Sequence, residues 1–498
     1  MSAAMQILET LRNKGVNPSG ISADSRSVRS GDLFAAMPGL RSDGRSFIAE
    51  AVARGAAGVL WESELGNVPE MSVPNLPIAG LHGLAGELAH LIYGRPSEKL
   101  WLCGVTGTNG KTSVSQWIAQ AGTLLGRKCG VIGTLGNGFP GALAESANTT
   151  PDVISIHSAL AGMLESGAKA CAMEVSSIGL DQGRGDGLHF TTAIFTNLTR
   201  DHLEYHGSME HYAAAKARLF AAPGLQSAVI NLDDAFGAQL YAGLAGKGVR
   251  RIGYTLTSAA QQHGPADEIL IAENLRIDGN GLAFELHTAQ GDISVSAPLY
   301  GRFNAANLLA VFGALLAAGF TPEQVAGVMP QLVAPPGRMQ TVSGGAGQAG
   351  PLVVVDYAHT PDALEQVLKT LREVAIARGG RLWCLFGCGG DRDPGKRPLM
   401  GEVVQRHADV AIVSSDNPRN ENPQAIIVDI LAGMQSDVRV DADRAGAIRQ
   451  MVLEAKRHDV LLIAGKGHET YQEIANRRLP FSDIEEAHKA LLARESAV

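Results

Sequence analysis

Short apolar runs that alternate with amphipathic segments dominate the middle of this chain. The strands predicted there lie at residues 100–103, 130–133, 170–174, 193–197 and 228–231. Helical patterns separate most of these runs, which favours a mainly parallel sheet covered by helices on both faces. Residues 268–299 instead alternate apolar and polar positions, and this pattern predicts an antiparallel excursion.

A similar alternation of strands and helices begins again after Pro335-Pro336-Gly337-Arg338, without any repeat of the sequence. The strands predicted in this last part lie at residues 352–356, 382–386, 410–414 and 460–464.

Before residue 98 the chain mixes helices, the first at 1–14, with short strands at 31–36 and 58–61, and 93–97 has the composition of a linker. We therefore predict an α/β protein of three domains. A small N-terminal α/β domain occupies 1–97, a central P-loop-type domain with a mainly parallel sheet occupies 98–336, and a Rossmann-like α/β domain occupies 337–498.

Composition supports this picture and excludes some functions. Of the 498 residues, 45% are hydrophobic and 18% are charged, as in ordinary globular proteins, and the length predicts several domains. The net charge of −8 and the lack of a basic tract argue against nucleic acid as a partner. The N-terminus lacks a signal-peptide core, and no apolar run is long enough to cross a bilayer. We expect a cytoplasmic monomer without membrane insertion, with its five cysteines as buried free thiols.

One stretch indicates phosphate binding. Residues 104–112, GVTGTNGKT, follow a predicted strand and precede a helical pattern. In such a cradle, backbone N–H groups and Lys111 face the phosphates, and the Thr112 hydroxyl can hold Mg²⁺. Val105 stands where the common pattern G-x-x-x-x-G-K-[ST] has glycine, and Gly107 is an extra glycine. The stretch therefore predicts ATP binding by an unusual form of this loop.

Three polar clusters stand in loops of the middle region. They are Asn148-Thr149-Thr150-Pro151, Met173-Glu174-Val175-Ser176-Ser177 and residues 197–207, NLTRDHLEYHG. A carboxylate at position 174, at the end of a strand, is suited to complete a Mg²⁺ shell with the phosphate loop. The first cluster is equally natural as a helix N-terminus. The third has so many ionisable residues that a role in packing would be unusual, and a solvated loop is its alternative. Lys216 lies in a helical run, where solvent exposure is the simplest prediction.

Taken together, these stretches resemble the Mur ligase family, the ATP-dependent amide ligases of peptidoglycan precursor synthesis. The resemblance covers nearly the whole chain in order. Its motifs lie at 107–112, 174–177, 197–207, 301–307, 336–338 and 356–361. The extra Gly107 belongs to the family's own version of the phosphate loop, which accounts for Val105.

The resemblance implies the residues of the nucleotide and metal sites. The expected ATP-binding residues are Gly107, Thr108, Asn109, Gly110, Lys111, Thr112, Asn304, Arg338 and Asp356. Glu174 and His202, with Thr112, are expected to bind or support Mg²⁺. Lys216 matches the lysine that is carbamylated in this family, where a neutral buried amine captures CO₂ and becomes an anion that helps to bind a second Mg²⁺. The expected catalytic residues are thus Lys111, Lys216 and His202.

The resemblance also implies a site for UDP-N-acetylmuramoyl-dipeptide. Its expected contacts are Ser25, Asn148, Thr149, Thr150, Ser176, Gln182 and Arg184. Leu40, Arg41 and Ser42 match a uridine loop whose sequence is less constrained. Ile178 departs from the family pattern, in which a histidine follows the two serines.

The C-terminal motifs point to the amino-acid substrate. The three motifs are Gly389-Gly390-Asp391-Arg392, Ser415-Asp416-Asn417-Pro418-Arg419 and Gly465-Lys466-Gly467-His468-Glu469. Each follows a predicted strand, so the motifs are expected to converge at one edge of the sheet. The residues that they contribute are Arg392, Asp416, Asn417, Pro418, Arg419, Gly465 and Glu469. They resemble the motifs of family members that add meso-diaminopimelate, in which Asp-Asn-Pro-Arg binds the amino acid.

Charge explains how such a site distinguishes its substrate. Meso-diaminopimelate has a carboxylate and an ammonium at its far end, whereas lysine has only the ammonium. Arg419 can pair with that carboxylate, and Glu469 can accept from the ammonium. Because lysine would leave Arg419 without an anion, discrimination of about a thousandfold is expected. The alternative, against which the companion motifs argue, is that Arg419 forms a surface salt bridge.

The expected reaction forms an amide between meso-diaminopimelate and the D-glutamyl γ-carboxylate of UDP-N-acetylmuramoyl-L-alanyl-D-glutamate, through an acyl phosphate made from ATP with Mg²⁺ as cofactor. Two alternatives stay open among ligases: addition of lysine, and extension of folate with glutamate. A P-loop regulatory module would bind nucleotide without forming an amide. A purely structural protein would need none of the ionisable loops.

Overall fold

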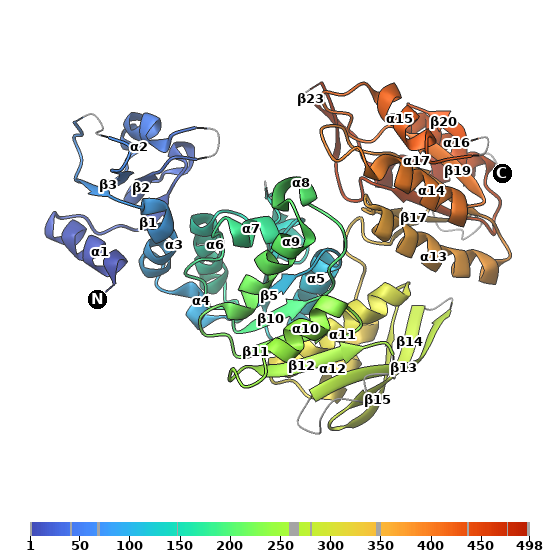
Figure 1. Cartoon of the computed structure of the whole chain (residues 1–498), viewed down its shortest axis with the longest axis horizontal. Coiled ribbons are helices and arrows are strands. Elements are labelled where there is room, and N and C mark those ends of the chain that lie inside the picture. The colour runs from blue at the N-terminus through green and yellow to red at the C-terminus, as the bar shows by residue number, and fades with distance from the viewer. Residues whose placement is uncertain are drawn as a thin grey trace.

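The computed structural model describes residues 2–39, 42–66, 70–146, 148–257, 268–278, 281–344, 350–435, 438–475 and 477–495. Leu40 and Arg41, two of the residues matched to the uridine loop, lie outside these ranges. Figure 1 shows three α/β bodies in chain order, with the N-terminal one in blue and the C-terminal one in orange and red on either side of the central one. The predicted α/β architecture is confirmed, while its domain limits stay predictions.

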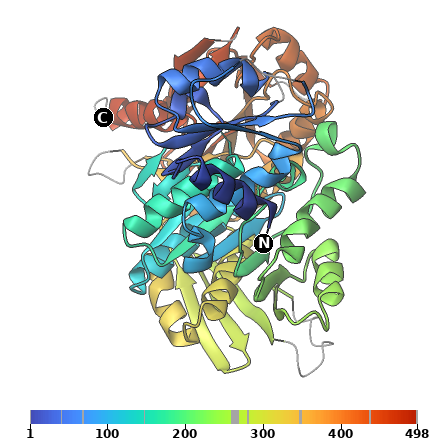
Figure 2. The same ribbon diagram turned by 90° about the vertical axis from the view of Figure 1, so that its left-hand side faces the viewer.

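The N-terminal domain is built on a parallel sheet in the order β1-β2-β3-β4. Its strands are β1 (Gly20–Ser22), β2 (Asp32–Ala36), β3 (Gly58–Glu62) and β4 (Asn75–Ile78). Its helices are α1 (Ala3–Asn13), α2 (Ile48–Ala53) and α3 (Leu81–Ile92). The linker predicted at 93–97 was wrong in part, because α4 (Pro96–Lys99) begins inside it with proline in the first helical turn, where no N–H is needed. Figure 2 shows this domain in front of the other two.

The central domain contains an eleven-stranded sheet in the order β15-β14-β13-β12-β11-β10-β5-β9-β6-β7-β8. The strands are β5 (Trp101–Thr106), β6 (Cys129–Gly133), β7 (Gly136–Phe139), β8 (Ala142–Ala144), β9 (Ala170–Glu174), β10 (Thr192–Phe195), β11 (Ser227–Asn231), β12 (Arg250–Thr255), β13 (Glu268–Asp278), β14 (Gly281–Thr288) and β15 (Gly291–Ala297). Pairing is parallel from β6 to β13, and the excursion predicted at 268–299 is antiparallel between β13, β14 and β15.

Helices cover both faces of this sheet. They are α5 (Lys111–Leu124), α6 (Val153–Glu165), α7 (Ser177–Asp181), α8 (Leu203–His206), α9 (Met209–Ala217), α10 (Ala235–Gly243), α11 (Arg302–Ala317) and α12 (Pro322–Val328). Strand β10 illustrates the two layers, since Ile194 joins the apolar cluster under α5 and α11 whereas Ala193 and Phe195 join the cluster under α6. Burial on both faces explains why the central strands are continuous apolar runs.

The C-terminal domain has a six-stranded sheet in the order β16-β17-β21-β18-β19-β20, parallel except for β16. Its strands are β16 (Gln340–Val342), β17 (Leu352–Asp356), β18 (Leu382–Phe386), β19 (Val410–Ser414), β20 (Arg439–Asp441) and β21 (Val460–Ala464), with a separate hairpin of β22 (Tyr471–Ile474) and β23 (Arg477–Pro480). Its helices are α13 (Pro361–Arg378), α14 (Lys396–His407), α15 (Pro423–Leu431), α16 (Arg444–Glu454) and α17 (Asp483–Glu495).

Two expectations from composition can be compared with these elements. All five cysteines are buried and free, as predicted. None of the helices in the described ranges combines the length and the apolar character needed to cross a bilayer.

A buried ion pair holds the edge of the C-terminal sheet where the predicted amino-acid motifs lie. Arg444 and Asp483 are fully buried and form two hydrogen bonds, of 2.7 and 2.8 Å. The same guanidinium donates to the carbonyl oxygens of Ser415 (3.3 Å) and Ala464 (2.9 Å), just past the ends of β19 and at the end of β21. Arg444 therefore fixes the two loops that follow these strands.

Replacing one partner of this pair should destabilise the C-terminal domain strongly. We expect Asp483→Asn to lower its free energy of unfolding by about 3–5 kcal/mol, because Arg444 stays buried without its counter-charge. Hydrogen exchange of β19 and β21 under mild urea measures this. Glu485→Gln, at an exposed position of the same helix, is the matched control. Equal protection in the two variants would contradict the role given to the pair.

Candidate active site

The loop that follows β5 leaves no room for side chains at two of its glycines. Gly107 has φ +151°, and a Cβ there would overlap the Thr196 hydroxyl oxygen. Gly110 has φ +88°, and a Cβ there would overlap the side-chain oxygen of Asn307. Val105 is a buried residue within β5. The loop therefore begins at Gly107, which explains why position 105 needs no glycine.

Two lysines converge on one carbonyl of this loop. Lys111 Nζ donates to the carbonyl oxygens of Gly107 and Thr108, both at 2.9 Å, and Lys216 Nζ donates to that of Gly107 at 2.8 Å. Lys216 is fully buried on α9, with its Nζ 4.3 Å from the centre of the Tyr212 ring. The exposure predicted from its helical run was wrong, because α9 packs against the loop. Burial, and then the neighbouring charge of Lys111, lower the pKa of Lys216 well below its ordinary value.

Oxygen atoms suited to a hard cation stand beside the loop. Glu174, fully buried at the end of β9, accepts from the hydroxyls of Thr112 (2.9 Å) and Thr134 (3.0 Å) and from the Thr134 N–H (2.9 Å). Neighbouring oxygen ligands of octahedral Mg²⁺ are also about 2.9 Å apart, so the Thr112 and Glu174 pair fits this ion. Arg338 donates to the Thr112 hydroxyl at 3.2 Å from the segment between the domains.

Two other residues expected to bind ATP, Asn304 and Asp356, support the phosphate loop and the segment between the domains. Asn304 is buried on α11, where its side-chain oxygen accepts from Asn307 at 3.1 Å, so it supports the residue that packs on Gly110. Asp356 accepts from the N–H groups of Met339 (2.7 Å) and Ala358 (2.8 Å), and it therefore braces the segment between the domains.

Most residues expected to contact the dipeptide form one hydrogen-bonded group at the end of β9. The Thr150 hydroxyl donates to the Ser176 hydroxyl at 3.1 Å, and Arg184 donates to the Thr150 carbonyl at 2.6 Å and to Gln182 at 2.6 Å. The Thr149 hydroxyl accepts from Thr134, while Asn148 is exposed. Ser25 lies apart in the N-terminal domain, where its hydroxyl donates to Glu50 at 2.9 Å.

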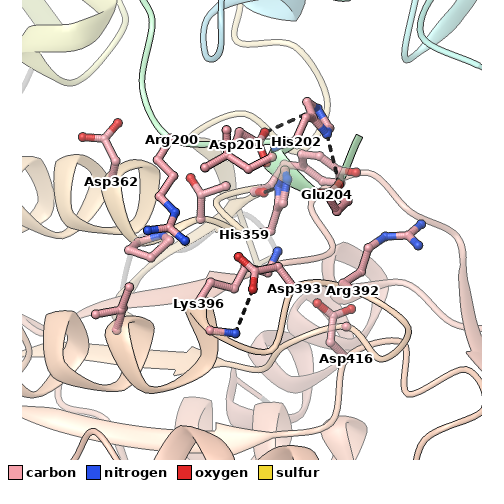
Figure 3. Close-up of a pocket in the computed structure, with 18 of the residues that line it drawn as sticks. Arg200, Asp201, His202, Glu204, His359, Asp362, Arg392, Asp393, Lys396 and Asp416 are labelled. Carbon is pink, nitrogen blue, oxygen red and sulfur yellow. Dashed lines mark hydrogen bonds and ion pairs between the residues drawn. The ribbon is translucent and has the colours of Figure 1, made fainter. Parts of the chain in front are cut away.

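A cavity of about 530 Å³ separates the central domain from the C-terminal domain. The predicted residues that line it are His202, Arg392, Asp416, Asn417, Arg419, Gly465 and Glu469; Pro418 is not among them. Figure 3 shows Asp201, His202 and Glu204 on the side of the central domain, with Arg392, Asp393 and Asp416 facing them from the C-terminal domain. The three C-terminal motifs thus meet at one place.

The C-terminal wall of this cavity is a dense polar network. Buried Lys466 donates to Asn417 and Glu469, both at 2.9 Å, and Asn417 donates to Glu469 at 2.7 Å. One carboxylate oxygen of Asp416 is buried without a hydrogen-bond partner among the described residues. Arg419 donates to the Gly390 carbonyl at 2.8 Å and forms an ion pair with Glu473 at 3.3 Å. Its side chain is only 19% exposed, so this ion pair lies in the wall of the cavity and not on the open surface.

The opposite wall holds a chain of charges that runs back to the phosphate loop. Burial opposes ionisation of Asp201, but His202, His359 and Lys111 together lower its pKa below the ordinary value. The His202 ring lies edge-on to Tyr212, the ring beneath Lys216. The Tyr212 ring therefore contacts both His202 and Lys216, and the His202 ring also pairs with Asp201 and Glu204.

Several residues of the cavity were not predicted from the sequence. They are Asp201, Asp362, Asp393 and Lys396, which line it, and Lys466 and Glu473, which bind its lining residues. Lys466 and Asp201 stand inside motifs that the sequence singled out, so position next to a recognised motif was the available signal. Glu473, 3.3 Å from Arg419, lies on hairpin strand β22 and carried no such signal.

Profiles of one family match three successive parts of the chain. They are described as "Mur ligase family, catalytic domain" over residues 17–93, "Mur ligase middle domain" over 105–315, and "Mur ligase, glutamate ligase domain" over 337–467. The chain belongs to the Mur ligase family. These matches cover all three α/β bodies.

Full-length relatives agree with this assignment. A protein of Ectopseudomonas mendocina named UDP-N-acetylmuramoyl-L-alanyl-D-glutamate–2,6-diaminopimelate ligase is 52% identical over 96% of each chain. A solved structure of an enzyme with that name is 37% identical, with a TM-score of 0.67 over 96% of this chain and 95% of its own. Folylpolyglutamate synthase of Mycobacterium tuberculosis, at 17% identity and a TM-score of 0.62 over 83% of this Mur ligase and 94% of its own chain, shares the fold.

A half-buried histidine in the lining of the interdomain cavity, His359, should make this Mur ligase less stable in acid. Burial, and then the charge of Lys396, lower the pKa of His359 to about 4, while its ordinary value is 6.5. The unfolded chain therefore binds the proton first, and stability is lost as the pH falls from 6.5 towards 4, by about 3 kcal/mol.

We expect His359→Asn, whose amide can still donate to the Tyr357 carbonyl, to remove most of this loss. The measurement compares urea-unfolding midpoints at pH 7 and pH 4, with exposed His488→Asn as the control. If the loss in acid were as large in His359→Asn as in the control, the folded protein would not hold His359 in its neutral form.

Proposed function

We propose that this Mur ligase joins the amino group of meso-diaminopimelate to the D-glutamyl γ-carboxylate of UDP-N-acetylmuramoyl-L-alanyl-D-glutamate, with ATP as co-substrate. Relatives that are 51–52% identical over 95–97% of the chain bear the name of that enzyme. The observation that carries the proposal is the interdomain cavity, which presents Arg419 together with the carboxylates of Asp416 and Glu469. These charges complement the carboxylate and ammonium of an amino-acid end group.

The nucleotide binds through the loop at 107–112. Backbone N–H groups at the start of α5 and the Lys111 ammonium face the phosphates, and Arg338 adds a second cation beside Thr112. Mg²⁺, held by Thr112 and Glu174, supplies positive charge to the phosphates when it is bound. The fit of these two oxygens supports that assignment.

The chemistry depends on charge and position and uses no covalent enzyme nucleophile. A carboxylate is a poor acylating agent, so its oxygen first attacks the γ-phosphate and ADP leaves. The amine then attacks the resulting acyl phosphate, the new C–N bond forms, and inorganic phosphate leaves with the carboxylate oxygen. Lys111 neutralises charge that develops during the first step, and the two walls of the cavity bring the amine to the acyl carbon.

Lys216 contributes as a carbamate. Its low pKa supports a neutral amine, which attacks CO₂, forms an N–C bond and releases one proton. The product is an anion beside the phosphate loop, since the Lys216 Nζ lies 2.8 Å from the Gly107 carbonyl oxygen. There it can help to hold a second Mg²⁺. His202 supports this group through Tyr212.

The UDP-dipeptide lies across the N-terminal and central domains. Ser25 contacts the UDP-sugar end, and the group of Thr149, Thr150, Ser176, Gln182 and Arg184, with exposed Asn148, contacts the dipeptide. The hydrogen bonds already present among Thr150, Ser176, Gln182 and Arg184 favour a preformed surface. The enzyme acts as a monomer.

Arg419 should determine which amino acid is used. With UDP-dipeptide, ATP and Mg²⁺, we expect wild-type enzyme to use meso-diaminopimelate about a thousandfold better than lysine, by kcat/KM. Arg419→Ala should raise the KM for meso-diaminopimelate about 100-fold and remove most of this preference, because the far carboxylate loses its partner. Product mass and phosphate release measure both quantities.

Arg406→Ala, at an exposed position of α14, is the control and should behave as wild type. Efficient use of lysine by the wild type would favour the lysine-adding alternative. Addition of glutamate to a folate would favour the other ligase, and nucleotide binding without any amide product would contradict the whole proposal.

Lys216 should be essential through its carbamate. We expect Lys216→Ala to lower kcat about 100-fold or more, and formate or acetate to restore part of it by replacing the missing carboxylate. Lys247→Ala, which removes an exposed lysine, should change nothing. Wild-type activity in Lys216→Ala, with or without short carboxylates, would rule out the carbamate.

A further inference from the structure

We propose that His90, Glu98 and His189 form a binding site for Zn²⁺ at the junction of the N-terminal and central domains. The site is separate from the nucleotide loop and from the interdomain cavity, and none of its three residues lines that cavity. Its ligands come from three elements: α3, α4 and the loop between α7 and β10.

The three side chains already have nearly the spacing of metal ligands. The Nε2 atoms of His90 and His189 lie 3.0 and 3.6 Å from the same carboxylate oxygen of Glu98. One ligand atom from each residue lies within 4.8 Å of the other two. Ligands of tetrahedral Zn²⁺ at about 2.0–2.1 Å are about 3.4 Å apart, so small side-chain rotations complete the geometry.

Two nitrogen ligands and one oxygen ligand favour a metal ion between hard and soft, such as Zn²⁺. Two imidazoles and a carboxylate are ligands typical of zinc sites with an open fourth position, whereas Mg²⁺ prefers oxygen alone. A ligating imidazole must be neutral and a ligating carboxylate must be ionised, so zinc binding competes with protons at this site.

The surroundings allow an ion to enter. His189 and Glu98 are 40% and 36% exposed, so the site opens to solvent, while His90 forms its inner wall. Buried His157 packs behind His90, with 5.3 Å between the centres of the two rings. Arg95 lies 3.7 Å from the Glu98 oxygen on an exposed side chain, which can turn into solvent when the metal ion binds.

Zn²⁺ at this place would connect two domains. The backbones of α3 and of the loop that carries His189 touch, since a Cβ on Gly86 would overlap the carbonyl oxygen of Asp186. The same loop continues from Gln182 and Arg184. Figure 1 shows α3 between the N-terminal sheet and α6, with α4 below α6. A metal ion shared by α3, α4 and this loop would therefore fix the N-terminal domain against the central one.

Zinc titration of the intact protein tests the site. Full-length enzyme is treated with a chelator and then titrated with Zn²⁺ alone, in competition with a chromophoric indicator. We expect one tightly bound equivalent that His189→Ala and Glu98→Gln each weaken by about 10–100-fold or more. His82→Ala, at an exposed position of α3, should bind as wild type and controls for other surface histidines.

A second readout separates ligation from a purely structural role. Co²⁺ in the site should give the visible absorption of a four-coordinate ion in the wild type and in His82→Ala, and this absorption should be lost in His189→Ala. Because both altered side chains are partly exposed, the variants should keep the wild-type urea midpoint without metal. Equal zinc affinity and equal cobalt spectra in wild type and His189→Ala would overturn the proposal.

Discussion

The carbonyl oxygen of Gly107 is the point on which the candidate site depends, because two lysines donate to it. Lys111 approaches from the helix that follows the loop, and Lys216 approaches from α9, which lies much later in the chain. Burial, and then the neighbouring charge of Lys111, lower the pKa of Lys216 well below its ordinary value. The geometry thus favours a neutral Lys216 amine beside a phosphate-binding loop.

The phosphate loop also contacts residues at the ends of neighbouring strands of the central sheet. Gly107 is pressed against Thr196, at the end of β10, and the residues that follow β10 form one wall of the interdomain cavity. Glu174, at the end of β9, binds Thr112 and Thr134. Neighbouring strands that end at one edge therefore bring the phosphate loop, a carboxylate and the cavity wall together, as expected for an open parallel sheet.

The C-terminal wall of the cavity is built in the same way, from loops at the carboxyl edge of a parallel sheet. Strands β18, β19 and β21 are neighbours, and the loops that follow them provide the charged lining. Buried Arg444 joins the ends of two of these strands. The cavity therefore presents rigidly held charges from two sheets, and its width depends on how the two domains approach each other.

Much of this arrangement could be predicted from the sequence. The features that could not be predicted were missed for physical reasons. The strands predicted at 352–356, 382–386, 410–414 and 460–464 are confirmed residue for residue, because fully buried strands are continuous apolar runs. Short, partly polar edge strands such as β4 and β20 lack that signal and were missed. The burial of Lys216 could not be predicted from the alanine-rich pattern of α9, since it depends on a contact between residues far apart in the chain. Glu473 was missed for the same reason.

The measurement that tests the central claim most directly follows one oxygen atom. UDP-dipeptide is prepared with ¹⁸O at both oxygens of the D-glutamyl γ-carboxylate and converted with ATP, Mg²⁺ and meso-diaminopimelate. If the phosphate loop and the cavity cooperate in forming an acyl phosphate and then an amide, each turnover transfers one ¹⁸O atom to inorganic phosphate. Amide formation that yields unlabelled phosphate would contradict this account.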